Sequence, residues 1–193
     1  MAEPAAAFPN FEPKRVKVFG VMHIVFGGLG FGQVLGNLAM TPFQKQIMSF
    51  SSMGSPDEVM EAQLVMMEKL KPFTWISIVI TLILASLIMR AGLRLVKKKP
   101  GALPASNLYA WCSIGAKAIL LILFFVMVQP IYNEMFESMF DDTTPGADEA
   151  LLVMRIATSV GGILGPLVTM VYPILALTML NKKIVKDYFS GLQ

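Results

Sequence analysis

The sequence predicts an all-α protein, a four-helix transmembrane bundle with a short amphipathic helix in its first outer loop. Hydrophobic residues make up 55% of the 193 residues and charged residues only 15%, whereas a soluble domain carries about 25% charged residues. The apolar residues gather into four blocks, each close to the roughly 20 residues that a helix needs to cross the hydrocarbon. Basic and acidic residues also alternate between the segments that join these blocks.

The predicted spans cover residues 18–40, 73–94, 108–131 and 156–181. Together they form a single transmembrane domain, residues 14–193. The segment before it, residues 1–13, contains Pro4, Pro9 and Pro13 among several alanines. A segment of this composition cannot bury enough apolar surface to fold, so we expect a disordered cytoplasmic tail.

The charges predict the orientation. Basic residues lie before the first span, between the second and third, and after the fourth, while acidic residues dominate the other two loops. Because cytoplasmic loops carry the excess of Lys and Arg, we expect a multi-pass protein of the cell (inner) membrane with both termini in the cytoplasm. The basic segments can bind anionic headgroups, each charge contributing about 1 kcal/mol near the surface, and need no nucleic acid to explain them.

The first outer loop contains a helix-start signal, the sequence SPDE at residues 55–58. The serine can cap a helix and the proline suits its first position. Met60, Leu64 and Met67 then recur at helical spacing. We therefore expect a short amphipathic helix at the outer membrane surface, ending before Pro72.

The other helix limits follow from aromatic residues and helical period. Tyr109 and Trp111 mark the inner end of the third span, because Tyr and Trp favour the membrane interface. The helical period runs past Pro130 through Phe136, so the third helix can continue beyond the proline. The fourth helix is expected to begin outside the membrane, near Ala147.

Two groups of glycines predict helix packing. Gly28, Gly32 and Gly36 are spaced four apart in the first span, and Gly161 and Gly165 repeat that spacing in the fourth. Residues four apart share one helix face, and without side chains there another helix can approach closely. We interpret these glycines as faces through which the protein self-associates or joins a larger membrane complex.

Four polar residues within the spans are candidates for a polar path: His23, Gln33, Asn37 and Lys117. A charge at depth is costly and by default suggests function. The long stem of Lys117 can instead carry its ammonium to the headgroups, or the group can hydrogen-bond within the bundle. Histidine and amide side chains in membrane helices commonly hydrogen-bond a neighbouring helix. The sequence leaves the structural and the functional interpretations open.

The sequence predicts a protein that is not an enzyme and holds neither cofactor nor metal. Its one cysteine, Cys112, cannot form an intramolecular disulfide, and a single histidine without a carboxylate in the spans is a poor metal site. No HExxH, CxxC, P-loop or GxSxG motif occurs. The leading hypothesis is a self-associating or complex-forming scaffold or accessory subunit. The alternative is a small channel or transporter with a polar path near Lys117 and His23.

The stretch KVFGVMHIVFGGLG, residues 17–30, resembles the first helix of small bacterial four-helix membrane proteins of unknown function. More distantly, it is similar to the opening helix of the CD20-like (MS4A) four-span family, which shares the cytoplasmic termini. The resemblance covers this helix and the topology. It implies helix packing and self-association, and it assigns no binding residue.

Overall fold

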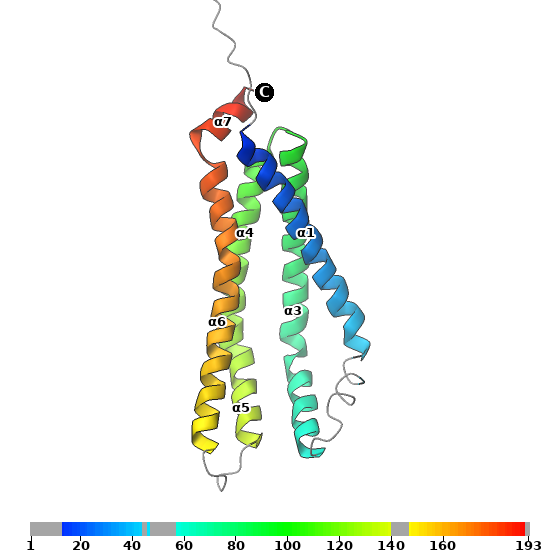
Figure 1. Ribbon diagram of the computed structural model, residues 1–193. Coiled ribbons are helices and arrows are strands. Elements are labelled where there is room, and N and C mark those ends of the chain that lie inside the picture. The colour runs from blue at the N-terminus through cyan, green and yellow to red at the C-terminus, as the bar shows by residue number, and fades with distance from the viewer. Residues whose placement is uncertain (1–12, 44–45, 47–56, 140–146, 192–193) are drawn as a thin grey trace, which may run out of the picture.

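The computed structural model describes residues 13–43, 46, 57–139 and 147–191. Its elements are α1 (Lys14–Met40), η1 (Thr41–Phe43), α3 (Asp57–Val96), α4 (Ala102–Leu123), the π-helical turn η2 (Phe124–Val128), α5 (Gln129–Met139), α6 (Ala147–Leu180) and α7 (Lys183–Ser190). In Figure 1, α3, α6 and the α4–α5 rod run alongside one another, and α1 crosses α3 obliquely.

Four helical stretches are long and apolar enough to cross a membrane: Lys14–Met40, Gln63–Val96, Ala102–Glu137 and Glu149–Leu180. This confirms the predicted all-α architecture with four spans. The predicted tail lies outside the described residues except for Pro13.

The helix of the first outer loop differs from the prediction. We expected it to end before Pro72, but α3 runs without interruption from Asp57 to Val96 and contains that proline. Proline removes one N–H, which would otherwise donate to the carbonyl of Glu68, whose side chain is 78% exposed. The lost bond therefore falls on an exposed turn, where water can replace it. The amphipathic segment is the N-terminal extension of the second span, and its predicted serine cap lies outside the described residues.

The third span continues past its proline, as the helical period predicted. Helix α4 passes through η2 into α5, which contains Pro130. At the end of η2, the Gln129 N–H donates to the carbonyl oxygen of Phe124, five residues back, so the turn is wider than an α-helical one. The Phe124 ring packs directly on Gly162 of α6, where it leaves no room for a Cβ. Helix α6 begins at Ala147, as predicted.

Helix α1 packs on α3 through residues that alternate three and four apart. These residues are Val16, Gly20, His23, Gly27, Gly30 and Val34. Such a 3.5-residue period is typical of left-handed helix packing. The backbones lie close together, since a Cβ at Gly92 of α3 would lie 2.9 Å from the backbone nitrogen of Ile24.

The glycines predicted to pack make no such contact within the chain. A Cβ added at any of the five positions would meet no atom within 4 Å: Gly28, Gly32, Gly36, Gly161 and Gly165. On α1 the reason is geometric. At 3.6 residues per turn, the seam with α3 takes one side of the helix, and the glycines spaced four apart fall on the opposite side. A packing role for these glycines between molecules stays a prediction.

The basic ends of the spans gather at one end of the molecule, where α7 lies across them (Figure 1). Helix α7 was not expected from the sequence. Its buried Val185 and Phe189 pack with Val16 of α1, Leu95 of α3 and Leu180 of α6. The cluster also contains Ala102 of α4, so it joins all four spans to the C-terminal helix.

Two asparagines connect α4 to the residue that follows α6, close to this cluster. Asn107 Nδ2 donates to Asn181 Oδ1 at 3.1 Å, and Asn181 Nδ2 donates to Asn107 Oδ1 at 2.8 Å. Each amide thus satisfies the other, and the pair fixes the relative position of the two helix ends.

Ion pairs join the helices at the acidic end. Lys69 of α3 pairs with Glu134 of α5 at 2.6 Å, and Arg155 of α6 pairs with Glu137 of α5. All four side chains are at least 41% exposed, so each pair contributes about 0–1 kcal/mol. Close packing and hydrogen bonds between the helices therefore hold the bundle together.

Candidate functional site

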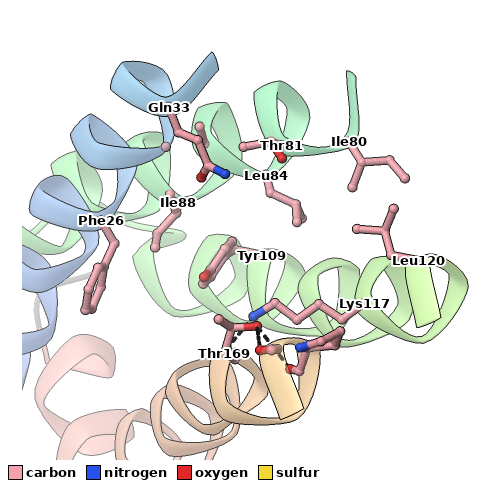
Figure 2. Close-up of a pocket in the computed structure, with 14 residues that line it drawn as sticks. Phe26, Gln33, Ile80, Thr81, Leu84, Ile88, Tyr109, Lys117, Leu120 and Thr169 are labelled. Atoms are coloured by element: carbon pink, nitrogen blue, oxygen red, sulfur yellow. Dashed lines mark hydrogen bonds between the residues drawn. The ribbon is translucent and has the colours of Figure 1, made fainter. Parts of the chain in front are cut away.

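A cavity of about 390 Å³ lies between the four spans. Its walls are formed by three residues of α1, five of α3, three of α4 and three of α6. The wall is mostly apolar, with five polar side chains: Gln33, Thr81, Tyr109, Lys117 and Thr169. Figure 2 shows Gln33, Tyr109 and Lys117 reaching into the space between the helices. An apolar hollow with a few converging polar groups is the usual form of a small-molecule site.

Lys117 is held inside the bundle. It lies near the middle of the span Ala102–Glu137, and its Nζ donates a hydrogen bond to the carbonyl oxygen of Thr169 in α6 (Figure 2). That oxygen would normally accept from the N–H four residues on, but residue 173 is a proline and has none. The lysine therefore supplies a donor that the α6 backbone lacks. Its ammonium ends on this carbonyl and is not carried to the headgroups.

The position of Lys117 has an energetic cost. Translocon scales assign about 2.5–3.5 kcal/mol to a lysine at the centre of a membrane helix. One hydrogen bond from a charged donor returns about 1.5–3 kcal/mol, so the carbonyl of Thr169 compensates for much of the cost. An ammonium has three donor hydrogens, which leaves two that can meet a ligand in the cavity.

The cavity is open on one side. The lining residues from α3 and α4 are buried or half-buried, whereas Phe26 and Gln33 of α1 and Gly165 and Thr169 of α6 are exposed. A Cβ at Gly165 would meet nothing within 4 Å. The opening therefore lies between α1 and α6 and faces the lipid.

A layer of aromatic rings closes the cavity towards the basic end. His23 is fully buried, and its ring centroid lies 5.5 Å from those of both Tyr109 and Tyr172. Its Nε2 is hydrogen-bonded to Ser106 Oγ at 3.0 Å and its Nδ1 to the Tyr172 hydroxyl at 2.5 Å. The Phe26 and Tyr172 rings, 4.5 Å apart between centroids, complete the contact between α1 and α6. His23 thus links α1, α4 and α6.

The structure places the four predicted polar residues in different surroundings. Gln33 and Lys117 line the same cavity. His23 lies in the aromatic layer behind Tyr109, which lines the cavity and contacts the histidine ring. Asn37, one turn beyond Gln33 on α1, is exposed and does not line the cavity.

Sequence reasoning missed several residues of this region. Tyr109 was expected at the membrane interface, yet it is only 6% exposed and packs on His23, while Trp111 is 66% exposed. The sequence did contain a pattern that indicates the inward-facing side of α4. Residues 106, 109, 113 and 117 are Ser, Tyr, Ser and Lys, a polar stripe spaced three and four apart along an apolar helix. Polar groups at such spacing favour a face directed to the bundle interior.

Comparisons of the chain with family models, with curated proteins and with solved structures found no match.

Proposed function

We propose that this chain is a non-enzymatic, multi-pass membrane protein that self-associates through the exposed glycine face of α1. One observation carries the proposal. Gly28, Gly32 and Gly36 are exposed along one side of a membrane span, and no atom of the chain lies within 4 Å of the position of a Cβ there. Glycine costs a helix about 1 kcal/mol relative to alanine, and intrachain packing gives no reason for these three.

A second copy of the chain is the occupant that fits this face. Lipid tails are as apolar as the side chains, so membrane helices associate by close packing, which small residues permit. The same face is present on every copy, so two copies can pair about a two-fold axis. Val21 and Val25, 48% and 53% exposed, extend the face by two turns and offer side chains that can pack over the glycines of the partner helix.

The opposite side of α1 is already occupied by α3, so self-association does not compete with the fold. A Cβ at Gly20 would lie 2.9 Å from Val96 and one at Gly27 3.2 Å from Met89. The two packing faces of α1 are therefore separate, and a substitution on the exposed face can disrupt the dimer without disturbing the bundle.

Orientation and location belong to the same proposal. Most of the basic residues lie at the start of α1, from the end of α3 into the turn after it, and from Lys182 into α7. These segments lie at one end of the molecule (Figure 1). By the positive-inside rule, this end faces the cytoplasm of a cell (inner) membrane, with both termini there. It can also bind anionic headgroups.

The experiment compares Gly32→Leu with Gly115→Leu. Gly115 of α4 is also exposed with nothing within 4 Å, so the two substitutions are matched in chemistry and surroundings. Native mass spectrometry in mild detergent should give a dimer for the wild type and for Gly115→Leu, and a monomer for Gly32→Leu with an unchanged unfolding temperature. A wild-type monomer, or a dimer that Gly32→Leu leaves intact, would refute self-association through this face. A complex with a different protein would favour the accessory-subunit hypothesis instead.

A second candidate, a small channel or transporter, is favoured by one observation. Gln33 and Lys117, expected from the sequence to share a polar path, line a single cavity. Ion flux into liposomes containing the purified protein tests this candidate. Flux that depends on Lys117 would support it, and flux equal to that of empty liposomes would exclude it.

A further inference from the structure

The cavity between the spans contains a cation without a counter-charge. Among the residues that line it in the described part of the chain, Lys117 is charged and none is a carboxylate. One of its donor hydrogens is used by the carbonyl oxygen of Thr169. Thr81 and Tyr109 add hydroxyls to the wall, and Gln33 adds an amide. The remaining ammonium hydrogens of Lys117 would be satisfied by a ligand that is an anion and accepts hydrogen bonds.

The shape of the cavity restricts how such a ligand enters. The aromatic layer around the buried His23 closes the basic end. The open side lies between α1 and α6, where Phe26 and Gly165 are exposed. A ligand that enters from this side comes from the bilayer, so it must itself be soluble in lipid.

We propose that the cavity binds a long-chain carboxylate, with its headgroup on Lys117 and its tail passing between α1 and α6 into the bilayer. The volume of about 390 Å³ lies within the range of about 300–1,000 Å³ usual for ligand sites. A single negative charge matches the single cation. A doubly charged phosphate would leave net charge in the membrane interior, and a neutral ligand would leave the lysine unpaired. This inference does not depend on self-association, which uses another face of α1.

The probe is radiolabelled oleate, added to the full-length protein in phosphatidylcholine nanodiscs, with empty nanodiscs as the background. The wild type should bind oleate saturably, one molecule per chain. Lys117→Leu should bind it about tenfold more weakly or worse, as expected when a charge-assisted hydrogen bond is lost. Oleyl alcohol has the same tail without the charge, and its weak binding should be equal for both proteins.

Two further variants locate the site. Lys183→Leu removes the same charge from the exposed surface of α7 and should bind oleate like the wild type. Gly165→Leu keeps Lys117 and adds a side chain at the cavity wall, where no atom lies within 4 Å. It should retain its unfolding temperature and lose oleate binding, so it decides the question even if Lys117→Leu fails to fold.

Three results would overturn the proposal: full oleate affinity in Lys117→Leu, full affinity in Gly165→Leu, or an equal loss in Lys183→Leu. An equal loss in Lys183→Leu would mean that oleate binding depends only on the surface charge of the protein. The mass of the oligomer, measured on the same samples, tests self-association separately.

Discussion

Lys117 and Pro173 compensate for each other, and their coupling can be measured. Pro173 has no N–H to donate to the carbonyl oxygen of Thr169, and Lys117 donates to that oxygen instead. In the Pro173→Ala protein the backbone N–H returns and can make the normal helical bond. We therefore predict that Lys117→Leu costs more stability in the wild-type background than in the Pro173→Ala background.

The substitution Lys117→Leu alone cannot reveal this coupling, because it changes two contributions to the free energy of unfolding that have opposite signs. Removing the lysine leaves a carbonyl unpaired, at a cost of about 1–3 kcal/mol, but it also removes a charge whose insertion costs about 2.5–3.5 kcal/mol. The double-mutant cycle cancels the charge term, since it is present in both backgrounds. Hydrogen bonds measured by such cycles in membrane proteins average about 0.6 and reach about 1.7 kcal/mol. Because the donor here is charged, we expect a coupling free energy in the upper part of this range, about 1–1.7 kcal/mol.

The assay is reversible unfolding of the four proteins in mixed micelles titrated with sodium dodecyl sulfate. The matched control is a second cycle with Pro166→Ala. Pro166 also lies inside α6, but the carbonyl that it leaves without a donor belongs to Gly162, whereas Lys117 donates to Thr169. Pro166 lines the same cavity as Lys117, but its substitution restores no donor to the carbonyl of Thr169, so that cycle should come within about 0.3–0.5 kcal/mol of additivity. The same additivity in the Pro173 cycle would refute the compensation.

Three further predictions concern packing, the buried histidine and topology. Gly92→Ala should destabilise the protein by about 1–3 kcal/mol through overpacking, because its Cβ would lie 2.8 Å from that of His23; Gly115→Ala, which meets nothing within 4 Å, should be neutral in the same unfolding assay. His23→Leu should cost about 1–3 kcal/mol, since two hydroxyls lose their partner, and equal stability would contradict this role. Reporters fused after Lys99 and after Thr144 should read cytoplasmic and external, and a reversed result for either would overturn the orientation.

The spans could be predicted from the sequence because their signal is local. A block of about 20 apolar residues identifies a membrane helix, whatever it packs against. The same holds for the continuation of the third span through Pro130, where the helical period persists on both sides. The rule that a proline ends a helix was wrong at Pro72, because α3 continues through that residue. Proline disfavours a helix through one lost bond and through the clash of its ring with the carbonyl four residues back. The cost of the lost bond depends on whether the freed carbonyl lies where water can reach it.

The packing face of α1 could not be predicted from glycine spacing alone, because the helix carries two glycine registers. Gly20, Gly27 and Gly30 follow the seam with α3, and Gly28 and Gly32 follow the four-residue repeat. A buried polar side chain needs a partner within the bundle, and His23 shares the seam register. Its position could therefore have selected the correct face. The hydrogen bond between Lys117 and Thr169 depends on how α4 and α6 are aligned along their length. No short sequence pattern predicts that alignment.

The structure places the polar residues in two layers, and their separation favours a binding cavity over a continuous polar path. Lys117 and Gln33 lie on one side of Tyr109, and the fully buried His23 lies on the other. Ions moving between the layers would have to displace Tyr109 or Tyr172. Displacing Tyr172 breaks its hydrogen bond to His23, and with it the link between α1 and α6. A ligand entering between α1 and α6 needs no such rearrangement, because Gly165 and Thr169 are already exposed there. The resting geometry therefore favours a site that is filled from the membrane and closed towards the basic end.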